Sequence, residues 1–378
     1  MSDGEDLVSR ARSIFARLRD DAEDQPEEPS PEPSDNGLTA VEAASEHELE
    51  AESPLEEAEV EPPPPEPEPP SPEPLHSIDA PVAAPEGGNA AAPALPERLV
   101  EPDEIPEPVV PEPAARPVRA LPRVIAVANQ KGGVGKTTTA VNLGAALAEL
   151  GYRVLVVDLD PQGNATTGLG INPRNVESSI YDVIMNGNPI EDAVEPTAVR
   201  NLFVVPATID LAGAEIELVP AFSRELKLRR ALDDATGEFD FTLIDCPPSL
   251  GLLTVNGLAA AAEVLVPIQC EYYALEGLGQ LLKNVSLVQT NLNPRLELSA
   301  IVLTMYDART RLAEQVAKEV REHFGDTVCR SIVPRTVRLS EAPSFGQPVI
   351  VFDSSSRGAL AYRELAKEVS GGTPQRTG

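Results

Sequence analysis

Residues 123–139 read RVIAVANQKGGVGKTTT, and this stretch decides the fold that we expect. The apolar run 123–129 predicts a strand buried on both faces, and residues 136–150 predict a helix with Gly151 at its C-cap. The glycines between them let successive backbone N–H groups turn inward at a helix N-terminus, where the helix dipole favours an anion. The stretch therefore predicts a phosphate-binding loop between a strand and a helix.

The loop carries the residue types that a nucleoside triphosphate and its magnesium ion require. Lys136 is placed to meet β- and γ-phosphate oxygens, and the Thr137 hydroxyl to ligate Mg²⁺. The usual P-loop pattern has glycine where this chain has Gln130, and a second lysine, Lys131, follows that position. We predict that the nucleotide is held by Gly132, Gly133, Val134, Gly135, Lys136, Thr137 and Thr138.

Four further apolar runs predict strands of the same sheet. They read RVLVVD at 153–158, FTLID at 241–245, EVLVPI at 263–268 and LSAIVLT at 298–304. Continuous apolar strands that alternate with helical segments predict an α/β fold, a mainly parallel twisted sheet flanked by helices. In such folds ligands bind at the carboxyl ends of the strands, which is where the predicted site residues fall.

Acidic residues end two of these strands. Asp245 ends FTLID and is suited to hold Mg²⁺ through water. Asp158 and Asp160 end RVLVVDLD, two residues apart and so on one side of an extended chain. One of the two can orient the attacking water or accept its proton, and the residues alone do not say which.

Charge and proline content divide the chain into two parts. Residues 1–120 hold 31 of the acidic residues, only 7 of the basic ones and 24 of the 39 prolines. Repelling carboxylates and missing backbone donors oppose the burial of a core, so we expect 22–120 to be a disordered linker. Residues 121–370 then form the folded domain, and 371–378 form a flexible tail.

The first 21 residues differ from the acidic linker. Apolar residues recur there at helical spacing, with arginines largely on the other side, which predicts a short amphipathic helix. Three interpretations stay open: a docking segment for a protein partner, a membrane-surface segment, and a nascent helix without a partner. The apolar positions are Leu7, Val8, Ala11, Ile14, Phe15 and Leu18.

Several protein classes are disfavoured by the sequence. The three cysteines have no paired spacing, which argues against a disulfide framework or a zinc site. The N-terminus has no apolar h-region, and no uncharged apolar run approaches the length of a membrane span. We therefore expect an intracellular protein.

Five motifs together resemble the ParA/Soj branch of the deviant-Walker P-loop ATPases. They are KGGVGKTTT at 131–139, VVDLDPQGNATTGLG at 156–170, LIDCPPSLG at 243–251, CEYYALEGL at 270–278 and PRTVRLSEAPSFGQP at 334–348. The resemblance covers about residues 121–370 and leaves residues 1–120 unexplained. It implies a cytoplasmic, nucleoid-associated bacterial protein that hydrolyses ATP with Mg²⁺ and segregates a chromosome or a plasmid.

The resemblance also implies a homodimer that sandwiches ATP. Lys131 would be the signature lysine that reaches the phosphates in the other subunit, and Asp160 the residue tied to the attacking water. Asp158 would then belong to the first switch segment. The loop of Pro334, Arg335 and Thr336 would lie against the adenine, with Thr336 where the family often has asparagine.

Family members bind double-stranded DNA without sequence preference in the ATP state. A ParB-type centromere-binding partner stimulates hydrolysis and release. The arginines that match the DNA-binding positions are Arg309, Arg311, Arg335 and Arg338, and the basic segment at 227–230 is a weaker candidate.

Three other functions remain as alternatives. A MinD-like membrane ATPase needs a C-terminal amphipathic basic helix, but this chain ends in a polar, glycine-rich segment. A nitrogenase-iron-protein relative needs cluster-bridging cysteines, and only Cys246 stands near the site. An ATP-gated scaffold that acts mainly through protein partners would explain the long N-terminal region.

Overall fold

The computed structural model describes residues 119–235, 237–271 and 274–371. The predicted helix at 1–21, nearly all of the predicted linker at 22–120 and residues 372–378 of the predicted tail lie outside these residues. Among the described residues no helix is long and apolar enough to cross a membrane.

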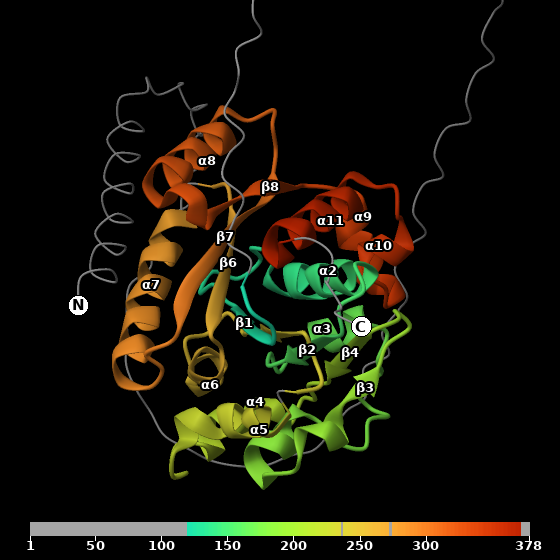
Figure 1. Ribbon diagram of the computed structural model, residues 1–378, viewed down its shortest axis with the longest axis vertical. Helices are drawn as coiled ribbons and strands as arrows, with labels where there is room; N and C mark the ends of the chain where they lie inside the picture. Colours follow the sequence, from blue (N-terminus) through green and yellow to red (C-terminus); the bar gives the residue numbers. More distant parts are fainter. Residues whose placement is uncertain (1–118, 236, 272–273, 372–378) are drawn as a thin grey trace, which may run out of the picture. The chain divides into compact units, whose positions relative to one another are not determined.

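A mainly parallel sheet of eight strands forms the centre of this part of the chain (Figure 1), which confirms the predicted fold class. Its strand order is β3-β4-β2-β5-β1-β6-β7-β8, and only the edge strand β3 is antiparallel to its neighbour. The five predicted strands are present within one or two residues of their predicted ends, and β3, β4 and β8 were not predicted. The strands are β1 Arg123–Val127, β2 Val154–Asp158, β3 Glu195–Pro196, β4 Leu202–Val205, β5 Phe241–Asp245, β6 Glu263–Gln269, β7 Glu297–Tyr306 and β8 Val328–Pro334.

Helices cover both faces of the sheet and bury one apolar cluster on each side. In β1, Ile125 and Val127 join the cluster with α2 and α11, whereas Ala126 joins the cluster with α5 to α8. Successive residues of a strand point to opposite faces, so both faces of the central strands are apolar. The helices are α2 Lys136–Glu149, α3 Asn164–Gly168, α4 Leu211–Glu217, α5 Lys227–Ala235, α6 Leu252–Ala260, α7 Ala274–Asn291, α8 Arg311–Phe324, α9 Val337–Glu341, α10 Val349–Phe352 and α11 Arg357–Ser370.

Helix α2 ends as its sequence predicts. Gly151 has a φ of 100° and follows the helix, and its N–H donates to the Ala148 carbonyl while the Tyr152 N–H donates to Leu147. This pair of bonds is the Schellman arrangement that favours glycine at this position.

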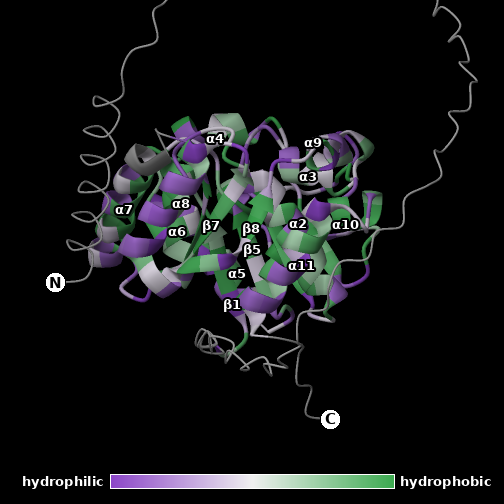
Figure 2. Cartoon of the chain, turned by 90° about the horizontal axis from the view of Figure 1, so that it is seen from above, coloured by the Kyte–Doolittle hydropathy of each residue, from purple (hydrophilic) through white to green (hydrophobic). Residues whose placement is uncertain are grey.

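The register of the central strands brings the predicted acidic residues together. Val127 of β1 and Asp158 of β2 both lie opposite Asp245 of β5. Because all three strands are parallel, their carboxyl ends share one edge of the sheet, the edge along which α3, α4 and α9 lie in Figure 2. The predicted site residues on these strands therefore meet there.

Candidate active site

The loop between β1 and α2 wraps its backbone around a small cavity. Gly133 and Gly135 have φ values of 74° and 85°, in the left-handed region that side chains with a Cβ rarely adopt. Val134 between them is buried, and its carbonyl accepts a 2.8 Å hydrogen bond from the Thr304 hydroxyl of β7. This bond fixes the loop to the neighbouring strand, so the nest of N–H groups at the start of α2 is held in place.

Lys136 lies buried at the start of α2 with its ammonium inside this loop. Its Nζ donates to the Lys131 carbonyl at 3.2 Å. Burial lowers the pKa of Lys136, and the neighbouring acidic groups, Asp245 first and then Asp160, oppose that shift. A buried cation beside carboxylates is well placed to neutralise phosphate oxygens.

Asp245 is the least compensated charge in the site. It is completely buried, and neither carboxylate oxygen has a hydrogen-bond partner of proper geometry among the described residues. Burial, and then the neighbouring Asp158, raise the pKa of Asp245 well above its usual range, although Thr137 and Lys136 oppose part of the rise. A buried, unpartnered carboxylate next to a threonine hydroxyl has the chemistry of an Mg²⁺ site.

The two other acidic residues, Asp158 and Asp160, to which the resemblance gives different roles, have different surroundings. Asp158 is fully buried, and its Oδ2 accepts hydrogen bonds from the backbone N–H (2.8 Å) and hydroxyl (2.6 Å) of Thr166. Burial raises its pKa to about 6 in spite of these bonds. Asp160 instead lines the cavity, where its Oδ1 accepts a bond from the Gln162 N–H. Of the two, Asp160 is therefore the one that faces the nucleotide position.

The cavity at this edge has a volume of about 450 Å³ and collects most of the predicted loop residues. Gly132, Gly133, Gly135, Lys136, Thr137, Thr138 and Asp160 line it, whereas the buried Val134 lies behind the loop. The sequence analysis did not single out Val141, Asn142, Gln162, Asn164, Thr167, Gly168, Pro248, Met305, Pro343 and Gln347, which also line it. Most of these lie inside the quoted motifs, so the motifs located the region but not the individual side chains.

Met305 is the residue least expected from the sequence. It is the half-buried penultimate residue of β7, lines the cavity and has a φ of 49°. A left-handed backbone at a long side chain is unusual and is found mostly where function or surrounding structure demands it.

The residues present fit a magnesium nucleotide. The loop offers N–H groups and the Lys136 ammonium to phosphates, and Thr137 and Asp245 offer oxygen atoms to the cation. Among the described residues no cluster of three or more metal-binding side chains occurs. Mg²⁺ in nucleotide sites takes most of its ligands from phosphate and water, so two protein oxygens are sufficient.

Lys131 does not line this cavity, and its Nζ forms a 3.2 Å ion pair with Glu271, two residues after β6. Its backbone N–H donates to Asn129 Oδ1 at 3.0 Å. The side chain is partly exposed.

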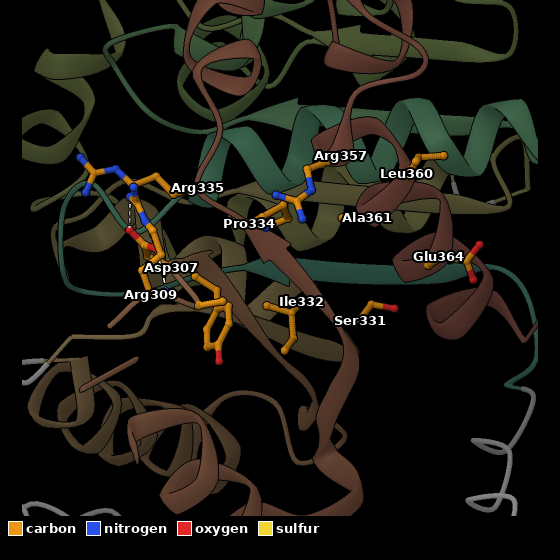
Figure 3. A pocket seen from close by; sticks show the side chains of 12 residues that line it. Asp307, Arg309, Ser331, Ile332, Pro334, Arg335, Arg357, Leu360, Ala361 and Glu364 are labelled. Carbon is orange, nitrogen blue, oxygen red and sulfur yellow. Dashed lines mark hydrogen bonds and ion pairs between the residues drawn. The ribbon is translucent and has the colours of Figure 1, made fainter. Parts of the chain in front are cut away.

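A second, larger pocket of about 910 Å³ collects arginines (Figure 3). Arg309 and Arg335, both predicted, line it together with Arg357 of α11, which the sequence analysis did not single out. Pro334 also lines this pocket, so Pro334 and Arg335 border it and not the nucleotide cavity. The predicted contact of Pro334, Arg335 and Thr336 with adenine stays a prediction.

The other basic candidates lie apart from this pocket. Arg338 of α9 forms ion pairs with Glu341 at 2.9 Å and with Asp353 at 3.2 Å. Arg311 begins α8 and does not line the pocket. In the weaker candidate segment, Arg229 contacts the Leu292 carbonyl and Asp233.

The chain is similar to known proteins over the domain that contains these sites. A family model described as an AAA domain matches residues 122–298. The sporulation initiation inhibitor protein Soj of Bacillus subtilis is 58% identical over 248 residues, which are 66% of this chain and 98% of Soj. The chromosome partitioning protein ParA of Myxococcus xanthus is 55% identical over 65% of this chain and 87% of its own length.

Solved structures agree with these relatives. One solved structure is a Mycobacterium smegmatis protein described as cobyrinic acid a,c-diamide synthase, with bound ADP and magnesium. It is 43% identical to this chain, with a TM-score of 0.58. The match covers 98% of that protein and 67% of this chain. The Pyrococcus furiosus cell division ATPase MinD is 26% identical with a TM-score of 0.55, over 66% of this chain and 99% of MinD. ATP and Mg²⁺ are thus the cofactors of this chain, and the residues of the 450 Å³ cavity have the chemistry to bind them. From the loop geometry and these similarities together, the chain belongs to the ParA/Soj family of chromosome-partitioning P-loop ATPases.

Proposed function

We propose that this ATPase forms an ATP-bound homodimer that grips double-stranded DNA without sequence preference and releases it on hydrolysis. A ParB-type centromere-binding protein would stimulate that hydrolysis, and the cell would use the cycle to segregate a chromosome or plasmid. The protein would then lie in the cytoplasm on the nucleoid. The observation that carries the proposal is a cluster of three arginines around a pocket separate from the nucleotide cavity.

The position of Lys131 supports the dimer. Lys136 lines the nucleotide cavity and would serve the phosphates of its own subunit, whereas Lys131 lies outside that cavity and pairs with Glu271, so its ammonium is available to a nucleotide in a facing subunit. Lys131→Ala should abolish ATP-dependent dimerisation and retain part of ATP binding. Full ATPase activity of a monomeric Lys131→Ala protein would contradict the cross-subunit role.

Asp160 supports the hydrolytic step. Its carboxylate lines the cavity and is held by the Gln162 N–H, so it can orient a water molecule or accept its proton. Asp158 accepts two hydrogen bonds from Thr166, so it would hold the backbone between these two residues in place. The Mg²⁺ ion, when bound, neutralises charge on the phosphate oxygens.

Arg309, Arg335 and Arg357 support the DNA-binding step. DNA phosphates need only a local group of cations, so the net acidity of the chain does not prevent binding. In a dimer two such groups would lie on one assembly and would double the number of phosphate contacts. The affinity for DNA should then depend on the nucleotide that controls dimerisation.

The first experiment measures binding of the Asp160→Ala protein to random duplex DNA with ATP, with ADP and without nucleotide, across a salt series. We expect binding only with ATP, and a log affinity that falls by about 0.9 per phosphate contact for each unit of log salt. Formation of the ATP dimer without DNA binding in any state would refute the DNA step and favour the scaffold alternative.

Asp307 gives a sharper test of the arginine pocket. Arg309 is 87% exposed, and both its Nε and its Nη2 donate to the Asp307 carboxylate, at 2.8 and 2.6 Å. A DNA phosphate has to displace Asp307 from Arg309, so Asp307→Asn should raise the DNA affinity about threefold to tenfold and steepen the salt slope by up to about 0.9. Glu364→Gln, in the same pocket but paired with Lys367, should leave the slope unchanged. An unaltered slope in Asp307→Asn would remove Arg309 from the contact.

A further inference from the structure

Asn129 lies where the chain leaves β1 and enters the loop before α2. Its side chain is buried, with 3% of the residue exposed. Its Nδ2 donates to the Pro267 carbonyl of β6 at 2.8 Å, and its Oδ1 accepts a hydrogen bond from the Lys131 N–H at 3.0 Å. One buried side chain therefore joins the neighbouring strand to the first part of the loop.

The bond to β6 continues the ladder of the sheet with a side chain. The Ala128 N–H donates to the Leu265 carbonyl, and in a parallel ladder the next β6 carbonyl that faces β1 belongs to the residue two positions on, Pro267. Asn129 supplies the donor for this carbonyl from its side-chain amide. The carbonyl is satisfied, and the backbone of the chain is free to turn away into the loop.

The bond to Lys131 is an Asx turn, in which an asparagine side chain binds the backbone N–H two residues on. The carbonyl of the same Lys131 accepts a hydrogen bond from the Lys136 Nζ at 3.2 Å. Both backbone polar groups of Lys131 are thus engaged, one by Asn129 and the other by the Lys136 ammonium. The place of the Lys131 backbone therefore governs where that ammonium lies.

Helix α7 covers this turn from the other side. A Cβ on Gly277 of α7 would lie 3.5 Å from the Asn129 Oδ1 and 3.7 Å from the Lys131 Cβ. Thr304 holds the loop at a different point, through its bond to the Val134 carbonyl. The start of the loop thus has its own attachment to the sheet, which Asn129 provides.

Asn293 offers a structural comparison. It is also 3% exposed, and its Nδ2 donates to the carbonyls of Leu258 at 3.2 Å and of Ala261 at 2.6 Å. None of these three residues lines the nucleotide cavity. The two asparagines therefore share burial and bonding to the backbone, and they differ in whether the bonded backbone leads to Lys136.

We infer that Asn129 is a positioning residue for nucleotide binding: through the backbone of Lys131 it sets the place from which the Lys136 ammonium meets the phosphates. The inference rests on the proposed binding of phosphate oxygens by Lys136. It adds a residue that does not itself line the nucleotide cavity. Without the bond to Asn129, the start of the loop can shift and carry the ammonium with it.

The experiment compares Asn129→Ala, Asn129→Ser and Asn293→Ala in the full chain. Fluorescent derivatives of a non-hydrolysable ATP analogue and of ADP are titrated with Mg²⁺, at a protein concentration where light scattering shows a monomer. Urea unfolding measures stability. A serine hydroxyl can form the same kind of turn with the N–H two residues on, but it lacks the amide donor for Pro267. Both variants at 129 therefore lose the bond to β6, and only the alanine loses the bond to Lys131.

Asn129→Ala should bind the ATP analogue about tenfold more weakly, as expected for one buried hydrogen bond. Its affinity for ADP should fall by less than about threefold, because ADP lacks the γ-phosphate that Lys136 is placed to meet. Asn129→Ser should keep the ratio of the two affinities within about twofold of the unaltered chain. Asn293→Ala also loses two buried bonds, so it should lose stability and leave the ratio unchanged.

A merely structural role would lower the folded fraction and so weaken both nucleotides equally. An unchanged ratio in Asn129→Ala, or an equal change in Asn293→Ala, would overturn the inference. A serine variant that loses as much of the ratio as the alanine variant would do the same, and it decides the matter if Asn129→Ala does not fold.

Lys136→Ala, measured beside these variants, separates the inference from the role of Lys136. Unweakened binding of the ATP analogue by Lys136→Ala would refute the proposed phosphate contact and the inference with it. Weak binding by Lys136→Ala together with a normal ratio in Asn129→Ala would overturn the inference alone.

Discussion

The central sheet buries one carboxylate at its amino edge, where the parallel strands begin, and another at its carboxyl edge, where they end. The two carboxylates have opposite surroundings. Glu263, at the amino end of β6, is held by Arg123 through two hydrogen bonds of 2.7 Å and by Arg119 at 3.4 Å. Burial raises the pKa of Glu263, but these partners outweigh burial and lower it. Asp245, at the carboxyl end of β5, has no such partner among the described residues, and burial raises its pKa.

The role of a buried acid depends on whether its charge is paired. A buried charge that is fully paired contributes to a defined fold, and removal of one partner leaves the other charge uncompensated. A buried acid without partners costs folding free energy and persists only where a ligand supplies the missing interaction. The amino edge of this sheet is thus structural, whereas the carboxyl edge has the chemistry of a site for a cation and phosphates.

The largest effect should come from removing the buried ion pair between Glu263 and Arg123 at the amino edge. Glu263→Gln leaves the Arg123 guanidinium buried without its countercharge, so we expect a loss of about 3–5 kcal/mol in the free energy of unfolding, measured with urea. Glu297→Gln, which removes an exposed partner of Arg119, should cost less than about 1 kcal/mol. A Glu263→Gln protein that keeps its stability but loses ATPase activity would show that Glu263 serves activity and not the stability of the fold.

The next effect concerns activity at the unpaired edge. Asp245→Asn keeps the shape of the side chain but removes the charge that would hold Mg²⁺, so the ATPase rate should fall about 100-fold or more. The rate is measured by phosphate release at saturating ATP, with the folded state checked by urea unfolding. Near-normal turnover would show that Asp245 does not serve the cation.

The smallest effect is the pH dependence of stability at the unpaired edge. Above about pH 4 the carboxyl of Asp245 ionises in the unfolded chain, whereas burial favours its protonated form in the folded chain. The unfolded state then binds fewer protons, so this residue lowers stability as the pH rises from about 4 toward its raised folded pKa. Without nucleotide, Asp245→Asn should be more stable than the unaltered protein by roughly 1–2 kcal/mol at pH 8, and the gain should vanish near pH 4.

Urea unfolding of both proteins at pH 8 and pH 5 measures this difference. Glu263→Gln provides the opposite sign, since the lowered pKa of Glu263 adds stability that is lost as the pH falls. A gain for Asp245→Asn that grew toward low pH would contradict the burial of an uncompensated acid at this edge.

Much of the fold and part of the site follow from local sequence. The apolar runs predicted five strands because a strand buried on both faces has to be continuously apolar. Gly133, Gly135 and Gly151 adopt the left-handed backbone that their positions in a loop and a C-cap require. Strands β4 and β8 were not predicted, because β4 has only four residues and β8 is interrupted by Arg330 and Ser331.

The sequence by itself determined the phosphate-binding loop, the acidic strand ends and the α/β architecture, because each depends on residues adjacent in the chain. The resemblance implied different roles for Asp160 and Asp158, and only the tertiary structure showed that Asp160 lines the cavity while Thr166 binds Asp158. The tertiary structure alone brought Arg357 to Arg309 and Arg335. These relations depend on strand order and on contacts between segments far apart in the chain, which no local pattern encodes.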